Sequence, residues 1–294
     1  MTLAKVEGAP ALARWTGRIS LFSLVLIVFA IAGHRFFGMA TPVLLDLLKV
    51  AFAGVLLSLV TALIAAVHVW RHGGSGGARI VVSLAIGLGI LAWPLTLLPD
   101  VQRLPMINDI TTDTVSPPEF TSLADVRSAA GRAAYDATGF AALQRKSYPD
   151  IVPMDVNRSV EETFDLVVDA VRRQRMRIVR ETPPGDENGR VGSLEAVDRT
   201  MIIGFNDDVA IRVTGDDTAS RVDIRSASRY GRHDLGRNVE RVRGLMREIV
   251  GRLESTIPGA AENRRKRARP EKGRGSTEPT ARKGADRKRA DPRR

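Results

Sequence analysis

Three long apolar stretches in the first hundred residues constrain this chain more than any other feature of its sequence. A helix needs about 20 residues to cross the roughly 30 Å hydrocarbon core of a bilayer. No charged residue interrupts the middle of any stretch, and Trp15, Trp70 and Trp93 stand near the ends, where interfacial aromatic residues are common. The sequence therefore predicts a membrane domain of residues 1–99 with three transmembrane helices, at about 19–37, 48–70 and 80–98.

The lysines and arginines beside these stretches predict their orientation, because cytoplasmic flanks carry an excess of such residues. Lys5, Arg14 and Arg18 precede the first stretch, and Arg71 and Arg79 lie between the second and the third. Acidic residues outnumber basic ones just after the third stretch. We expect a multi-pass protein of the bacterial inner membrane, with its N-terminus in the cytoplasm and its large domain in the periplasm.

The first stretch also has the features of a signal peptide. A basic segment precedes it, and Ala30-Ile31-Ala32 has the small residues of a cleavage site. The sequence leaves both interpretations open. Cleavage would leave two spans and would keep the large domain on the same side of the membrane.

The positive charge of the chain is concentrated at its C-terminal end. The whole chain has a formal net charge of +11, and residues 259–294 alone contain 14 basic and 5 acidic residues. This segment has almost no apolar residues, which predicts a disordered basic tail. In the periplasm its expected partners are anionic lipid headgroups or other envelope polyanions, or it has no fixed partner. Nucleic acid becomes a partner only if the topology is inverted.

Residues 100–258 have the patterns of an α+β domain. Ser159 and Glu162 fit a capping box, and apolar residues recur at helical spacing from Val160 to Val171. A shorter helix is expected between Ala129 and Lys146, and a long final helix at about Leu235–Ile257. Alternating apolar residues and turn signals predict strands at about 176–181, 190–197, 200–205, 209–214 and 221–226.

This order of elements predicts a two-layer domain, an antiparallel sheet of four to five strands flanked by helices. One face of the sheet is expected to pack against the helices. The other face would carry Arg212, Arg221, Asp223 and Arg225, so we expect it to be polar and open to solvent.

Four blocks of residues within this domain resemble, in order, the DUF1499 family, a domain of unknown function. The blocks are residues 107–112 with 117–120, then 148–153, 205–213 and 221–236. The resemblance covers about residues 104–255. It implies membrane helices in front of the domain, and it implies no established reaction. The basic tail is a departure from the family.

The densest polar run, residues 225–238, joins the last expected strand to the last helix. Free N–H groups at a helix start attract anions, and nearby arginines strengthen the attraction. The candidate anion-binding residues are Arg225, Arg229, Arg232, Asp234 and Asn238. In the alternative interpretation, Asp234 caps the helix while Arg229 and Arg232 pair with carboxylates of the domain.

Other chemistry is hard to assemble from this sequence. The chain has no cysteine, which excludes disulfides, thiolate metal sites and a cysteine nucleophile. Asp207-Asp208 offers too few oxygen ligands for a hard cation, and His233 is the only histidine of the domain. We therefore expect no catalytic residues, no metal and no cofactor. The predicted function is a binding or scaffold module at the cell envelope. The alternative is an enzyme or a lipid- or anion-handling factor that uses loop 225–238.

Overall fold

The computed structural model describes residues 11–130, 135, 137–185 and 190–255. The predicted basic tail lies outside these residues, and so do four residues before β4, 186–189.

The N-terminal part of the described chain consists of helices, as the apolar stretches predicted. They are α1 (Ala11–Phe36), α2 (Thr41–His72), α3 (Gly77–Thr96) and the short α4 (Leu98–Arg103). Three helices, with α4 continuing α3, are long and apolar enough to cross a membrane. A side chain at Gly54 would collide with Ser23 of α1, and one at Gly87 would collide with Leu59 of α2. These glycines therefore allow the helices to pack closely.

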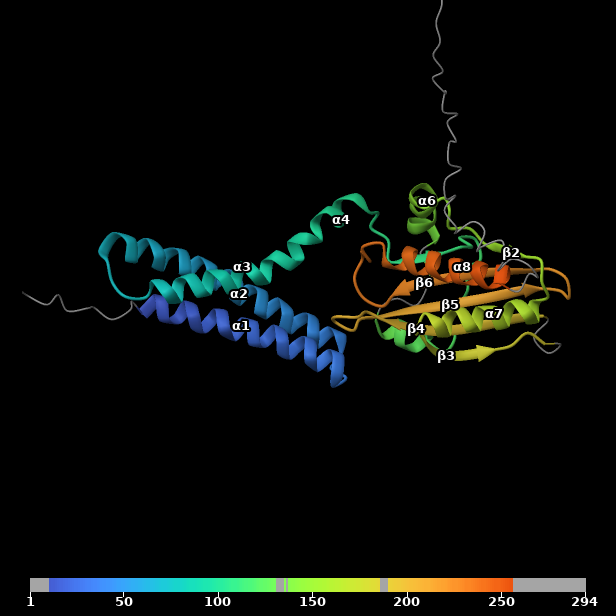
Figure 1. Cartoon of the computed structure of the whole chain (residues 1–294), viewed down its shortest axis with the longest axis horizontal. Helices are drawn as coiled ribbons and strands as arrows, with labels where there is room; N and C mark the ends of the chain where they lie inside the picture. The colour runs from blue at the N-terminus through green and yellow to red at the C-terminus, as the bar shows by residue number, and fades with distance from the viewer. Residues whose placement is uncertain (1–10, 131–134, 136, 186–189, 256–294) are drawn as a thin grey trace, which may run out of the picture. The chain divides into compact units, whose positions relative to one another are not determined.

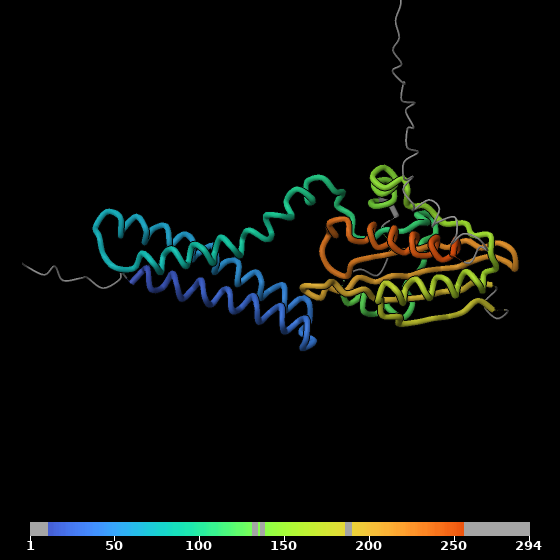
Figure 2. The backbone as a smooth tube through the Cα atoms, in the orientation of Figure 1, coloured from blue at the N-terminus to red at the C-terminus, as the bar shows by residue number. Residues whose placement is uncertain are grey.

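The domain that follows is built on one antiparallel sheet of six strands, in the order β1-β6-β5-β4-β3, with β2 also paired to β6. Figure 2 traces the consecutive hairpins from β3 to β6. The strands are β1 (Asp109–Thr111), β2 (Met154–Val156), β3 (Arg177–Thr182), β4 (Val191–Arg199), β5 (Asn206–Gly215) and β6 (Ser220–Ser228).

The α+β class is confirmed, although two details of the expected sheet differ. The short strands β1 and β2 come from segments in which no strand was expected. Residues 200–205, expected as a strand, form a turn between β4 and β5. The side chain of Thr200 holds this turn, because its Oγ1 accepts hydrogen bonds from the N–H groups of Gly204 and Phe205.

Helices α7 (Val160–Arg173) and α8 (Arg237–Ser255) cover one face of the sheet (Figure 1). The predicted cap of α7 is present, since Ser159 Oγ accepts a hydrogen bond from the N–H of Glu162 at 3.2 Å. Apolar residues of both helices and of β4, β5 and β6 form the core beneath them, and Val167, Val213 and Leu245 are fully buried in it.

The opposite face is not open, so that expectation was wrong. Phe120 and Leu123 pack against apolar side chains of β4, β5 and β6, and α5 (Ala124–Ala129) follows them. Asp223 and Arg225 are consequently 1% and 3% exposed, and only Arg221 remains exposed as expected. The apolar residues of the covering segment do not recur at a regular spacing, so the sequence did not show that this segment returns to the sheet.

The helix expected between Ala129 and Lys146 is α6 (Ala137–Ser147), and part of the expected range lies outside the described residues. Gln144 of α6 protects the outer edge of β1. Its side-chain amide accepts from the N–H of Thr111 at 3.1 Å and donates to the carbonyl oxygen of the same residue at 2.6 Å. The side chain thereby takes the place of a neighbouring strand.

Candidate functional site

Arg225, the first candidate anion-binding residue, lies on the face of the sheet that the 120–130 segment covers. Its Nε and Nη2 donate to the two carboxylate oxygens of Asp109 in β1, at 3.0 and 2.8 Å. Its Nη1 donates to the carbonyl oxygen of Pro118 at 3.1 Å. The guanidinium is therefore satisfied by the protein itself, in the bidentate geometry that makes such pairs strong.

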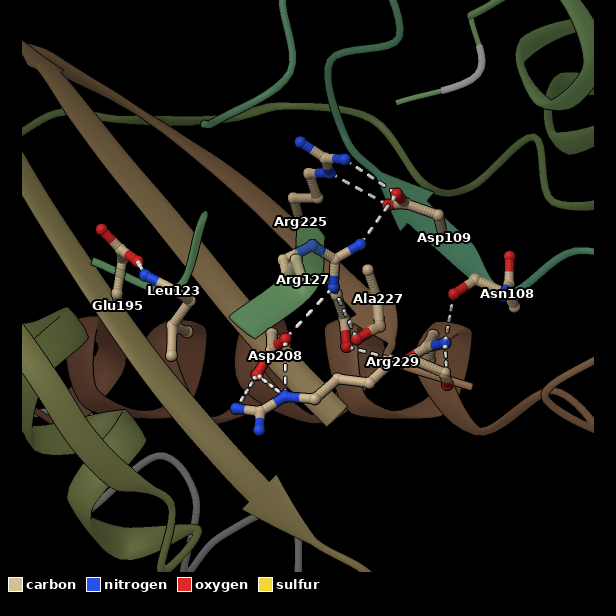
Figure 3. Close-up of polar contacts among 12 residues, drawn as sticks. Asn108, Asp109, Leu123, Arg127, Glu195, Asp208, Arg225, Ala227 and Arg229 are labelled. Carbon is tan, nitrogen blue, oxygen red and sulfur yellow. Dashed lines mark hydrogen bonds and ion pairs between the residues drawn. The ribbon is translucent and has the colours of Figure 1, made fainter. Parts of the chain in front are cut away.

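Arg229 is paired in the same way with Asp208 of β5 (Figure 3). Its Nε lies 3.0 Å from each carboxylate oxygen, and its Nη2 lies 2.7 Å from Oδ1. Asp208 is fully buried and also accepts from Nη1 of Arg127 at 3.2 Å. Burial lowers the pKa of Arg127, and the nearby Asp109 and Asp208 oppose this effect.

These five residues form one buried or nearly buried group, which we call the arginine–aspartate cluster: Arg127, Arg225, Arg229, Asp109 and Asp208. The ring of Phe120 lies beneath two of its guanidiniums, with its centroid 4.4 Å from Cζ of Arg127 and 4.8 Å from Cζ of Arg225. The covering segment is held on the sheet through Arg127, which pairs with Asp208 and Asp109, and through the ring of Phe120.

Glu195 of β4 fastens the same segment a short distance away. Its carboxylate accepts hydrogen bonds from the backbone N–H groups of Thr121, Ser122 and Leu123, at 2.9 to 3.0 Å. The side chain is 4% exposed. The three backbone N–H groups stabilise the charge of this buried carboxylate, so the role of Glu195 is structural.

A second polar group lies on the helix face of the sheet, because adjacent residues of a strand point to opposite sides. Asp207 therefore faces α8, and Nη2 of Arg241 donates to it at 2.7 Å. Arg241 also donates to Asp198 at 2.8 Å and to the side chain of Asn238 at 2.7 Å. Asn238 is fully buried and bonds Ser226, Ser228 and the carbonyl oxygen of Asn108.

The start of α8, expected to be an anion site, already holds a carboxylate. Asp234 accepts hydrogen bonds from the backbone N–H groups of Gly236 and Asn238, both at 2.9 Å. Burial raises the pKa of Asp234, and the two backbone bonds oppose the rise. The capping role that the sequence suggested for Asp234 is thus present in the structure.

The structure does not bring the five candidate residues together around one space. Arg225 and Asn238 lie on opposite faces of the sheet, and Arg232 is exposed on the loop between β6 and α8. Within the described part of the chain, the side chain of Arg232 makes no ion pair or hydrogen bond. The anion site stays a prediction, and it now depends on Arg232 rather than on Arg225 or Arg229.

Sequence reasoning missed the residues that complete both polar groups, notably Arg127 and Arg241. Arg241 carried a usable signal, because it falls on the same stripe of α8 as Asn238, Leu245 and Ile249. A charged residue in a buried stripe indicates a partner on the sheet. Arg127 carried no such signal, since α5 is only six residues long. Among the described residues, no group of three or more His, Cys, Asp or Glu side chains could hold a metal ion.

The fold and these contacts define the class of protein: an α+β domain, built on a single antiparallel sheet, that follows three apolar helices of spanning length. Residues 109–249 match the family model described as a protein of unknown function (DUF1499). This part of the chain therefore belongs to the DUF1499 family, as the four sequence blocks indicated. No curated protein matches the chain.

Proposed function

We propose that this chain is a multi-pass protein of the bacterial inner membrane that presents its DUF1499 domain in the periplasm. The domain serves as a binding or scaffold module rather than as an enzyme. One observation carries the proposal: three apolar helices lead directly into a folded domain, with only five residues, 104–108, between α4 and β1. Once the helices are inserted, such a short connector keeps the domain at the membrane surface.

The positive flanks support the orientation. Arg71 and Arg79 border the loop between α2 and α3, and this positive charge supports a cytoplasmic position for the loop. The third helix then leaves the membrane on the opposite side. Residues after it, beginning with Leu104, would lie in the periplasm.

Single cysteines test this topology cleanly, because the natural chain contains none. Val115 is 91% exposed in the domain, and Ser75 lies in the loop between α2 and α3. In cells whose outer membrane has been permeabilised, a thiol reagent that cannot cross the inner membrane should label Val115→Cys and spare Ser75→Cys. Labelling both variants after cell lysis is the control. The reverse pattern would place the domain in the cytoplasm.

The basic tail, residues 259–294, completes the proposal for partners, although it lies outside the described residues. In the periplasm its 14 basic residues would meet anionic lipid headgroups or other polyanions of the envelope. Each basic residue near an anionic surface contributes about 1 kcal/mol, and the contribution falls as salt is added. The topology experiment decides between these partners and nucleic acid, which would require a cytoplasmic tail.

A second candidate function is lipid or anion handling, which is favoured by an apolar pocket and exposed arginines at residues 229–237. The loop lines a largely apolar pocket with Tyr230 and Leu235, and Phe205 of the β4–β5 turn contributes to the same pocket. Arg232 and Arg237 are exposed nearby. An apolar pocket beside exposed guanidiniums has the chemistry to hold an anionic group that carries an apolar body.

Thermal melts of the full chain in detergent test this candidate, with phosphate and chloride compared at matched ionic strength. If the loop binds the anion, phosphate at 100 dissociation constants stabilises the domain by about 2.7 kcal/mol. Arg232→Ala should remove this gain without changing the melt in chloride, because the side chain is exposed. Arg247→Ala, an exposed arginine in the middle of α8, is the matched control and should keep the gain. Equal melts in both salts would exclude the site.

A further inference from the structure

The two ends of the sheet differ in what they expose. The turn between β4 and β5 carries Met201 and Ile202, which are 86% and 65% exposed. Met106, in the connector before β1, is 54% exposed. Exposed apolar side chains that occur singly are common, but neighbouring ones on a turn expose apolar area that water disfavours.

The register of the strands places these residues at the same end of the sheet. Arg199 at the end of β4 pairs with Asn206 at the start of β5, so the turn projects beyond that pair. Asp208 of β5 and Asp109 of β1 both pair with Ala227 of β6. The first residue of β1 therefore lies at the end of the sheet from which the β4–β5 turn projects.

That end is also where the chain arrives from its apolar helices. Five residues separate the end of α4 from β1 and can span about 20 Å at most. The connector is held against the loop that precedes α8. The carbonyl oxygen of Ile107 accepts from the N–H of Asp234 at 3.3 Å, and the carbonyl oxygen of Leu104 lies 3.2 Å from Nε2 of His233. The covalent path thus keeps this end of the sheet close to the end of the third apolar helix.

Exposed cations stand at the same end. Arg232 lies on the loop between β6 and α8, Arg237 is the first residue of α8, and both are exposed. Apolar side chains that enter a bilayer interface, with arginines beside them for the lipid phosphates, are the usual elements of a peripheral membrane contact.

We propose that the β4–β5 turn is a membrane-interface anchor: Met201 and Ile202 insert into the lipid headgroup region, and Arg232 and Arg237 face the lipid phosphates. The contact would attach the domain directly to the lipid, in addition to the tether, and fix which face of the domain is turned away from the lipid. The inference rests on insertion of the three apolar helices and is independent of the side on which the domain lies.

Spin labels on the full chain test the anchor in vesicles of phosphatidylcholine and phosphatidylglycerol. One label is placed at Ile202→Cys, and the matched control at Val115→Cys, also an exposed apolar residue of the domain. Oxygen concentrates in lipid, whereas a nickel chelate stays in water. We expect oxygen to relax the label at 202 more than the chelate does. At 115 we expect the chelate to relax the label more than oxygen does.

A third label, at Leu57→Cys in the middle of α2, separates this inference from the proposal on which it rests. Leu57 is exposed in an apolar helix, so its label should respond to oxygen alone once the helix is inserted. A chelate-accessible label at 57 would refute membrane insertion itself. If the label at 57 lies in lipid and the label at 202 lies in water, the helices are inserted and only the anchor is overturned. Protection of the label at 202 from both reagents would place the turn against protein and would also overturn it.

Discussion

Replacing Asp208 with Asn should destabilise the domain by about 3–5 kcal/mol, because it removes one partner of a buried ion pair. Asp208 is fully buried and accepts hydrogen bonds from Arg229 and Arg127. The amide keeps the shape of the side chain but removes its charge, which leaves three buried or nearly buried guanidiniums with Asp109 as their only carboxylate in the cluster. The neutral amide oxygen of asparagine cannot balance the positive charge of the guanidiniums, which the carboxylate balances in the natural chain.

Urea-dependent pulse proteolysis of the full chain in detergent measures this loss, because it reports the folded fraction of the domain. Asp217→Asn is the matched control, the same chemical change in an exposed pair. Asp217 lies 2.8 Å from Arg190, and its side chain is 75% exposed. Surface pairs contribute about 0–1 kcal/mol, so this variant should unfold close to the natural chain. Equal stabilities of the two variants would mean that the cluster is not a structural element.

Leu245→Ala should cost about 2–5 kcal/mol, the range for a buried leucine that leaves a cavity behind. Leu245 is fully buried on the side of α8 that faces the sheet, together with Val242 and Ile249. The substitution removes apolar contacts and opens space that the rigid sheet beneath cannot fill. The same proteolysis measurement gives the loss.

Val250→Ala provides the comparison within the same helix. Val250 is 42% exposed, so its truncation should change the free energy of unfolding by about 0.5 kcal/mol or less. A loss of that size at Leu245 as well would show that α8 does not contribute its apolar stripe to the core.

Much of the fold could be predicted because the signals that encode it are local. The three apolar helices follow from unbroken apolar length, α7 from a capping serine and helical spacing, and β5 and β6 from alternation of apolar residues. Each signal acts over a few turns of helix or a few residues of strand. Residues 200–205 were misjudged for the opposite reason: the hydrogen bonds that Thr200 Oγ1 accepts from the N–H groups of Gly204 and Phe205, rather than the pattern of apolar residues, decide their conformation.

The candidate site could be predicted only as a list of residues. The sequence placed several arginines near a helix start, and that composition suits an anion site and a set of internal ion pairs equally well. The capping role of Asp234 could be inferred, because its partners Gly236 and Asn238 are close in the chain. The pairing of Arg229 with a carboxylate was also inferred, but the sequence did not show that the carboxylate is that of Asp208.

The sequence by itself determined three apolar helices of spanning length, an α+β domain of the DUF1499 family after them, and a basic tail. Only the tertiary structure decided which arginines are paired with carboxylates of the domain. Arg225 meets a carboxylate 116 positions earlier in the chain, and Arg229 meets one 21 positions earlier. Such pairs depend on strand register and on a segment that folds back over the sheet. A guanidinium is available to a ligand only where that long-range packing brings no carboxylate to it.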